Sequence, residues 1–296
     1  MRWPLFRGVV RLPPPSFCRK GVAMAEQQPL HPLLVVAETA ARAAGAVALS
    51  IYHQAEVRSW EKGEDNPLSE ADLAVDRLLH ERLLGAAPDF GWLSEESLDD
   101  PARLARDWVW VVDPIDGTKE FLQKVPHWTV SIGLVHHGVV QLGVVFNPSE
   151  DLLVAGAVGE GITTNGVPAT LSATTELVGA HLVGSRSEQK RGEFDDVRDL
   201  YRFEAVGSIA YKMALLAIGR CDLYYTLSPK HEWDICGGHA LVVAAGGRVT
   251  QKDGTPILYN QPKAKYRSVV AANPILHAQL LARLKGAELS PDLHAR

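Results

Sequence analysis

The sequence predicts a mixed α and β fold in which an α+β half precedes an α/β half. Two features predict it: an antiparallel hairpin pattern between residues 128 and 146, and short strands that alternate with helices after residue 179. The 296 residues exceed the usual domain size of about 100–150 residues. We therefore expect an N-terminal segment at residues 1–25, followed by two subdomains at residues 26–178 and 179–296.

Each expected element follows from a local pattern. Alanine-rich apolar spacing predicts the first helix, and Ser69 is the expected N-cap of the second. Alternating apolar residues around the turn His136-His137-Gly138 predict the hairpin. In the first half we expect helices and strands at residues 33–52, 69–84, 107–112, 128–135, 139–146 and 151–158. In the second half we expect them at residues 181–184, 209–218, 221–226, 234–245, 248–250 and 268–272, with a final helix from residue 274.

Composition favours an intracellular enzyme. The net charge of −5, from 30 basic and 35 acidic residues, argues against a broad surface for binding nucleic acid polymers. No uninterrupted apolar run is long enough for a membrane-spanning helix, so we expect no membrane association. The cysteines at positions 18, 221 and 236 are too few and too scattered for a disulfide framework or a zinc site. A reducing compartment, and thus the cytoplasm, is the simpler expectation.

Residues 1–25 differ from the rest of the chain. They are basic, carry no acid before Glu26 and contain three consecutive prolines at positions 13–15. The bias is similar to an organelle transit segment, although the prolines would break an amphipathic helix and serine is scarce. Met24 could equally be the start of the chain. In either case we expect a disordered, dispensable segment.

The main chemical signal is the run Asp113-Pro114-Ile115-Asp116-Gly117-Thr118, directly after an apolar stretch that predicts a buried strand. Pro114 should end the strand, so that the carboxylates of Asp113 and Asp116 converge. The carbonyl of Ile115 could join them as a ligand. Oxygen ligands of this kind suit Mg²⁺, and two such ions can activate water for phosphate ester cleavage.

Further acids lie elsewhere in the chain, at Glu95-Glu96 and at Trp233-Asp234. Each signal also has a simpler interpretation. The run at residues 113–118 could be an ordinary turn, the two glutamates could be a surface pair, and Asp234 could be a helix cap. Occurring together, they favour a metal site.

The segments 94–97, 113–118 and 233–234 resemble the three signatures of the Mg²⁺-dependent, lithium-sensitive inositol monophosphatase superfamily. Residues 66–72 resemble its mobile loop and the following helix start, and the resemblance extends over residues 33–284. It implies a layered αβαβα sandwich with two or three Mg²⁺ ions between the subdomains, and it is compatible with a monomer or a homodimer. The metal ligands that it implies are Glu95, Asp113, the Ile115 carbonyl, Asp116 and Asp234, with Asp72 near a third ion.

The same resemblance implies catalytic and substrate-binding residues. Thr118 would hold the attacking water together with Glu95 or Asp72, and Gly117 would bind phosphate through its backbone. Lys119-Glu120-Phe121 resembles the 3'(2'),5'-bisphosphate nucleotidase branch, as do Ser185-Arg186-Ser187 and the pair Gly207-Ser208 followed by Lys212. From these matches, the expected substrate-binding residues are Gly117, Thr118, Ser185, Arg186, Gly207 and Lys212.

Other residues bear on the choice of branch. Glu188 stands where those nucleotidases usually have His, and one extra residue separates Gly207 from Lys212. Leu227 occupies the position where inositol monophosphatases have a Glu that binds a ring hydroxyl, and an aliphatic side chain cannot replace it. The run at residues 125–128, in contrast, is similar to the inositol enzymes.

The substrate expected from this branch carries two phosphates and about four negative charges, so the second phosphate needs cations. Arg186, Lys212 and Lys230 are candidates, and Lys62 could reach the site from the loop before Asn66. Our main hypothesis is hydrolysis of the 3'-phosphate of adenosine 3',5'-bisphosphate. The alternatives are a phosphatase of inositol or other polyol monophosphates and a catalytically silent family member, although every expected ligand position is filled.

Overall fold

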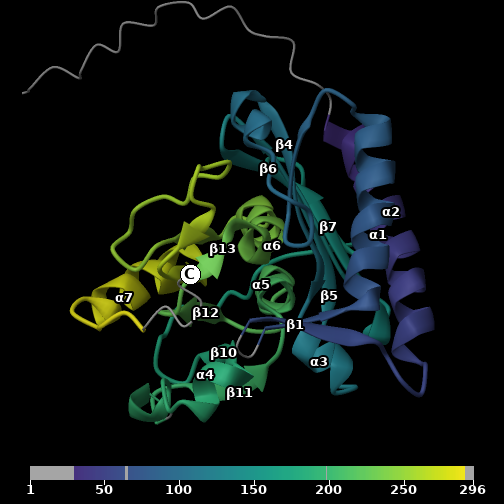
Figure 1. The fold of residues 1–296 in the computed structure, drawn as a ribbon. Helices are drawn as coiled ribbons and strands as arrows, with labels where there is room; N and C mark the ends of the chain where they lie inside the picture. Colours follow the sequence, from purple (N-terminus) through teal and green to yellow (C-terminus); the bar gives the residue numbers. More distant parts are fainter. Residues whose placement is uncertain (1–29, 64–65, 198, 291–296) are drawn as a thin grey trace, which may run out of the picture.

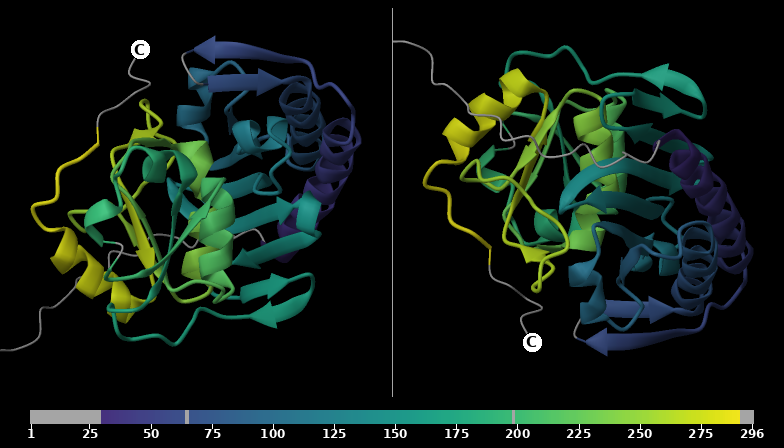
Figure 2. Two further views of the ribbon diagram at one scale, coloured as in Figure 1. Left: turned by 90° about the horizontal axis from the view of Figure 1, so that it is seen from below. Right: turned by 90° about the horizontal axis from the view of Figure 1, so that it is seen from above.

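The computed structural model describes residues 30–63, 66–197 and 199–290, so the segment 1–25 lies outside the described residues. Helices and sheets alternate in five layers (Figures 1 and 2). Helices α1 and α2 cover one face of a seven-stranded sheet, α5 and α6 lie between it and a five-stranded sheet, and α7 packs on the second sheet. The predicted αβαβα sandwich is confirmed. The α-helices of the described residues are α1 (Leu30–Tyr52), α2 (Glu70–Ala86), α3 (Thr118–Leu122), α4 (Arg186–Lys190), α5 (Ile209–Ala217), α6 (Glu232–Ala244) and α7 (Pro274–Leu284).

The large sheet has its strands in chain order, and the neighbours are antiparallel except for the parallel pair β3 and β4. Its center is the predicted hairpin, in which Val130 pairs with Phe146 and Leu134 with Leu142. Successive side chains of each strand point to opposite sides of the sheet, one toward α1 and the next toward α6, and this produces the alternating pattern. The strands are β3 (Gly91–Ser94), β4 (Trp108–Asp116), β5 (Thr129–His136), β6 (Val139–Asn147), β7 (Leu152–Ala157), β8 (Gly161–Thr164) and β9 (Val167–Ala169).

The second sheet is mixed, with the order β11-β10-β12-β16-β14. Strand β10 is parallel to both of its neighbours, and β16 is antiparallel to both of its own. Chain connection through α5 and α6 explains the alternating pattern of the second half. The strands are β10 (His181–Ser185), β11 (Arg202–Val206), β12 (Leu223–Thr226), β14 (Arg248–Thr250) and β16 (Val269–Ala272). The division into subdomains at residues 178/179, between β9 and β10, stays a prediction.

Several short elements were not expected. Two antiparallel pairs lie apart from the main sheets: β1 (Ser59–Gly63) with β2 (Asn66–Ser69), and β13 (Lys230–His231) with β15 (Lys265–Tyr266). The strands β3, β8, β9 and β11 and helix α4, each of three to five residues, were also missed. Three single turns of 3₁₀ helix complete the described elements: η1 (Pro101–Ala105), η2 (Pro148–Glu150) and η3 (Asp195–Val197).

Helix α1 is long and apolar enough to span a membrane by length and composition, with a mean hydropathy of 1.5 over its best window. The contacts of α1 within the protein give another reason for its apolar composition. The small side chains of Ala37, Ala41, Ala44 and Ala48 are fully buried in a cluster with α2 and the large sheet. In this structure one face of α1 packs on the large sheet, and its alanines allow that close packing.

Glycines bring α6 equally close to the opposite face of the large sheet. A Cβ on Gly133 would lie 2.4 Å from Cys236 Sγ, and one on Gly143 would lie 2.2 Å from the Gly237 carbonyl oxygen. Side chains at these positions would push α6 away from β5 and β6. The close packing matters because the first turn of α6 carries Asp234.

The expectation that Pro114 ends the strand is wrong. Strand β4 continues to Asp116, and its pairing with β5 shifts between Asp113, opposite Ser131, and Asp116, opposite Thr129. Three steps on β4 thus match two on β5, which is a β-bulge. In a regular strand residues three apart point to opposite faces, so the extra residue is what turns both carboxylates toward one side.

Candidate active site

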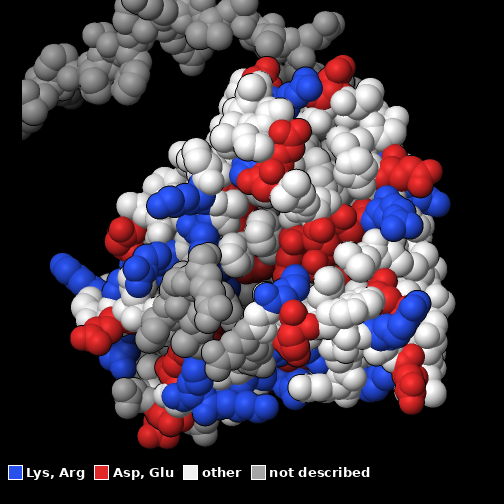
Figure 3. Space-filling view, in the orientation of Figure 1, with Lys and Arg blue, Asp and Glu red and all other residues white. Residues whose placement is uncertain are grey.

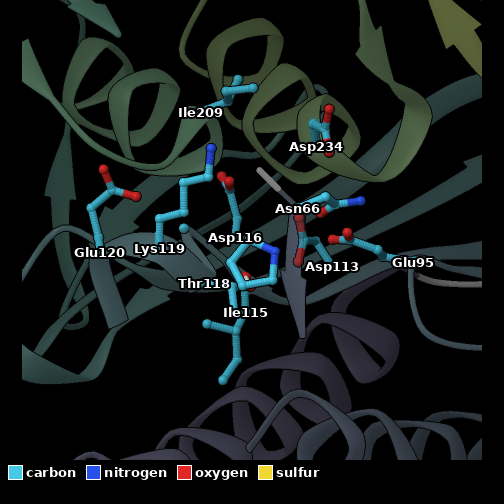
Figure 4. A pocket seen from close by; sticks show the side chains of 12 residues that line it. Asn66, Glu95, Asp113, Ile115, Asp116, Thr118, Lys119, Glu120, Ile209 and Asp234 are labelled. Carbon is cyan, nitrogen blue, oxygen red and sulfur yellow. Dashed lines mark hydrogen bonds between the residues drawn. The ribbon is translucent and has the colours of Figure 1, made fainter. Parts of the chain in front are cut away.

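A cavity of about 230 Å³ opens where β4 ends. In Figure 4, Glu95, Asp113 and Asp234 gather on one side of it and Lys119 and Glu120 on the other. Acidic side chains also gather in the middle of the face drawn in Figure 3. The cavity is lined by Asn66, Pro67, Glu95, Asp113, Ile115, Asp116, Gly117, Thr118, Lys119, Glu120, Ile209 and Asp234. The structure thus brings all five predicted ligand residues to one pocket.

Three of these acids come within reach of a single ion. One carboxylate oxygen from each of Glu95, Asp113 and Asp234 lies within 4.8 Å of the others. Glu95 directly follows β3, Asp113 belongs to β4 and Asp234 to α6, so three remote segments meet. Asp113 Oδ1 is buried and has no hydrogen-bond partner. A buried acceptor without a partner is costly unless a cation satisfies it.

Three aspartates of the pocket hold their protons more tightly than usual. Burial, followed by the charge of Asp234, raises the pKa of Asp116 to about 7. Burial, followed by the charge of Glu95, raises the pKa of Asp234 to about 7. The pKa of Asp113 is also raised, by burial first and then by the charges of Glu95, Asp116 and Asp234. Divalent cations relieve this repulsion, so the donor set fits oxygen-coordinated metal ions.

Asp116 is held from the other sheet. Its Oδ2 accepts hydrogen bonds from Ser208 Oγ at 2.7 Å and from the Ala210 N–H at 2.6 Å. Ser208 caps α5 with a positive φ of 52°, a conformation that is uncommon for a residue with a side chain. The sequence argument had singled out Ser208 only within a motif, and the structure places it against a candidate ligand.

Thr118 and Asp72 form the predicted pair. Thr118 Oγ1 lies 2.8 Å from Asp72 Oδ1 and 3.1 Å from the Ile115 carbonyl oxygen. Burial raises the pKa of Asp72 to about 6, although hydrogen bonds from Ser69 and Thr118 oppose this. Ser69 caps α2 as predicted, and Asp72 completes the capping box by accepting from the Ser69 N–H. Gly117 precedes Thr118 with a φ of 100°, and a Cβ there would lie 2.9 Å from the His127 carbonyl oxygen.

Asp76, one turn after Asp72 on α2, was missed by the sequence argument. It accepts hydrogen bonds from Ser94 Oγ at 2.5 Å and from Ser97 Oγ at 2.7 Å. These serines flank Glu95 and Glu96, so Asp76 holds both ends of the loop that carries Glu95. A helix period of four between Asp72 and Asp76 was the available signal.

Lys62 reaches the same loop from strand β1. Its Nζ lies 2.7 Å from one oxygen of Glu95 and 2.7 Å from one oxygen of Glu96. The pKa of Glu96 is raised to about 7 by burial and by the charge of Glu95, and the ion pair with Lys62 opposes this rise. In this structure the Lys62 ammonium therefore neutralises part of the acidic group.

The predicted substrate residues lie in three settings. Arg186 pairs with Glu120 at 3.0 Å, and Ser185 caps α4 by accepting from the Glu188 N–H. Lys212 is buried in α5, where its Nζ donates to the carbonyl oxygens of Val206 and Ser208, which flank Gly207. Direct contact of these residues with a substrate stays a prediction.

Burial lowers the pKa of Lys212 to about 8, although the charges of Asp116 and Glu188 raise it. Because its ammonium binds the β11–α5 turn, Lys212 can act through the position of Gly207 and Ser208. Lys230 instead pairs with the buried Glu188 at 3.1 Å. Neither lysine is among the residues that line the cavity.

Comparison with known proteins agrees with this geometry. The model of the inositol monophosphatase family matches residues 29–288. The chain belongs to the inositol monophosphatase family. Its members are metal-dependent phosphatases, which agrees with the acidic group around Asp113.

Individual relatives fall into different branches of the family. A 3'(2'),5'-bisphosphate nucleotidase CysQ of Shigella flexneri is 32% identical over 225 residues, which cover 74% of this chain and 90% of the relative. Inositol monophosphatase 1 of Solanum lycopersicum is 30% identical over 276 residues, covering 90% of this chain and 99% of the relative. The crystal structure of the extragenic suppressor protein suhB of Bartonella henselae superposes with a TM-score of 0.77 and 28% identity, covering 86% of this chain and 99% of that one.

Proposed function

We propose that this protein is a Mg²⁺-dependent phosphomonoesterase that removes the 3'-phosphate of adenosine 3',5'-bisphosphate. The observation that carries the proposal is the division of charge within one pocket. Glu95, Asp113 and Asp234 converge on one side, whereas Lys119 and Glu120 line the other, where Glu120 pairs with Arg186 at the rim. A substrate with two phosphates needs both sides, one for the reacting phosphate and one for the second.

The ligands of two or three Mg²⁺ ions would be Glu95, Asp113, the Ile115 carbonyl, Asp116 and Asp234, with Asp72 near the third ion. When bound, such ions lower the pKa of water and neutralise the phosphate oxygens. The protein residues orient these groups. Ser208 fixes Asp116, and the capped first turn of α6 fixes Asp234 through the His231 N–H at 2.8 Å.

Thr118 and Asp72 would move the proton of the attacking water. The oxygen of Thr118 can accept a hydrogen bond from that water, while its own hydroxyl donates to Asp72. A carboxylate with a pKa of about 6 can take this proton near neutral pH. Water then attacks phosphorus, the bond to the 3' oxygen breaks, and this oxygen leaves as a hydroxyl after taking a proton from solvent.

A phosphatase of inositol or other polyol monophosphates is the second candidate. The run at residues 125–128 and the relative from Solanum lycopersicum favour it. Leu227 opposes it, because a leucine cannot accept a hydrogen bond from a ring hydroxyl. Lithium inhibition, a property of the superfamily that the sequence resembles, would be compatible with both candidates.

The test compares kcat/KM of the purified protein for adenosine 3',5'-bisphosphate and for inositol 1-phosphate, with Mg²⁺ and with EDTA. We expect a preference for the bisphosphate of about tenfold or more and no turnover in EDTA. The Asp116→Asn variant, purified in parallel, controls for contaminating phosphatases. Equal or faster turnover of inositol 1-phosphate would remove the nucleotidase assignment, and absence of turnover on either would favour a catalytically silent protein.

A further inference from the structure

An ion pair joins the two sheets of the molecule at the rim of the metal pocket. Glu120 Oε1, in α3, lies 3.0 Å from Arg186 Nη1, at the first residue of α4. Helix α3 follows strand β4 of the large sheet, whereas α4 follows β10 of the second sheet. The two side chains are only 13% and 27% exposed. At this burial the pair is better shielded from water and salt than a surface ion pair.

The backbone leaves room for this pair. A Cβ on Gly207 would lie 2.5 Å from Glu120 Cγ and 2.8 Å from the His127 carbonyl oxygen. Glycine at this position therefore lets the Glu120 side chain pass between the β11–α5 turn and the segment at His127. Lys212 holds the same turn by donating hydrogen bonds to the carbonyl oxygens of the turn. The position of Glu120 thus depends on several residues of the second sheet.

The pair lies beside another cation. Lys119 and Glu120 both line the pocket, and Figure 4 shows their side chains together on the side opposite Glu95. This side therefore carries the cation Lys119 and, through its bond to Glu120, the cation Arg186, whereas the metal-ligand side carries acids. Arginine presents several N–H donors in one plane, and the bond to Glu120 uses one of them. The others can bind a phosphate oxygen.

We propose that Glu120 is a specificity-determining positioning residue, which holds Arg186 beside Lys119 so that the second phosphate of a bisphosphate substrate is bound at this side of the pocket. The inference rests on the proposed function and adds the residue that organises the second phosphate site. Glu120 itself does not touch the substrate. It acts through Arg186, because a long side chain loses rotamer freedom when it is fixed, and an ion pair formed before binding lowers that cost.

Other acids would compete for Arg186 without Glu120. Glu150 and Glu204 both influence the pKa of His127, as do Arg186 and Glu120, so all four charges lie in one region. The pKa of His127 is lowered, mainly by burial. Without Glu120, the Arg186 guanidinium could pair with these acids instead. It would then lie beside the pocket for a smaller fraction of the time.

A double-mutant cycle on the full chain tests the inference. The variants are Glu120→Gln, Arg186→Gln and both together, with adenosine 3',5'-bisphosphate and adenosine 3'-monophosphate as substrates. We expect Glu120→Gln to raise KM for the bisphosphate about tenfold more than KM for the monophosphate, with a smaller change in kcat. In the Arg186→Gln background the same change should alter this ratio less than about twofold. Lys190→Gln removes a charge from an exposed residue of the same helix and is the matched control.

Each outcome decides between the claims. If the two single effects on the ratio add in full, or if Glu120→Gln weakens both substrates equally, Glu120 does not act through Arg186 and the inference fails while the proposed function stands. If the wild-type protein does not turn over the bisphosphate, the proposed function fails. The same cycle is then run with the bisphosphate as a competitive inhibitor, and non-additive inhibition constants would still support the role of Glu120.

Discussion

Asp234→Asn should make the metal-free protein more stable although it removes a metal ligand. Asparagine has nearly the same shape as aspartate, and its oxygen can still accept the hydrogen bond that the His231 N–H donates. What changes is the charge, which in the wild type lies partly buried beside Glu95 and Asp113. The variant therefore separates electrostatic repulsion from the packing of α6.

The magnitude follows from the pKa. Asp234 has a pKa of about 7 in the folded protein and about 3.9 in the unfolded chain. A group whose pKa is raised on folding contributes stability that is fully present below the unfolded pKa and is lost as pH rises through the folded pKa. Near pH 8 the loss is at most about 4 kcal/mol, at 1.36 kcal/mol for each tenfold change in proton affinity. Near pH 4 it falls to about 0.5 kcal/mol.

Thermal and denaturant unfolding in EDTA, followed from about pH 4 to pH 8, measure this difference. We expect the variant to be more stable than the wild type near pH 8, by roughly 2 to 4 kcal/mol, and nearly equally stable near pH 4. Saturating Mg²⁺ should remove most of this difference, because ligand at 100 times its Kd stabilises the wild type by about 2.7 kcal/mol and the variant binds it weakly. Turnover should be lost.

Asp222→Asn is the matched control, because this carboxylate is not among the residues that line the pocket and its pKa is shifted in the opposite direction. Partial burial raises the pKa of Asp222, but hydrogen bonds from the His181 N–H and Ser172 Oγ outweigh it, so the pKa is lowered overall. This variant should be less stable than the wild type above the unfolded pKa and should respond normally to Mg²⁺. A wild type that is more stable than Asp234→Asn near pH 8 in EDTA would refute the reasoning.

Three further predictions concern single contacts. Thr118→Ala should lower kcat about 10²-fold or more in steady-state assays while Thr118→Ser retains most activity, and equal losses would argue against the hydroxyl. Asp76→Ala should raise the Mg²⁺ concentration for half-maximal activity by roughly 10- to 100-fold, because the serines beside Glu95 lose their anchor; an unchanged activation curve would contradict this. Gly133→Ala should destabilise the protein by about 1–3 kcal/mol in thermal unfolding, since its Cβ meets Cys236 Sγ at 2.4 Å, and an unchanged melting temperature would show that α6 can shift freely.

Long elements were predictable from the sequence because they repeat a pattern. Strand β5 alternates from Val130 to Leu134 and β6 is mostly apolar, and α1, α2 and α6 are long enough for their apolar spacing to show. Several short elements were not, although β10, β12, β14 and β16, of three to five residues, were predicted. Strand β1 is exposed along all five of its residues, so no apolar period marks it, and β8 and β9 have only four and three residues.

The candidate site shows the same division. Sequence reasoning selected the acids that line the pocket, because carboxylates beside Gly and Thr after a strand indicate metal-assisted phosphate chemistry. It did not find the residues that hold them. Asp76 and Ser208 were missed as partners of the site, since a hydrogen bond between residues 18 to 92 positions apart leaves no local pattern.

The sequence by itself determined which oxygen donors this chain possesses, the strand and helix periods that carry them and the family to which they belong. The tertiary structure decided that a bulge turns Asp113 and Asp116 to one side, that Lys212 binds its own backbone and that Arg186 meets Glu120. The physical reason is the distance along the chain over which each interaction acts. Periodicity and capping act over a few residues, whereas the meeting of charges from two sheets depends on how the whole chain packs.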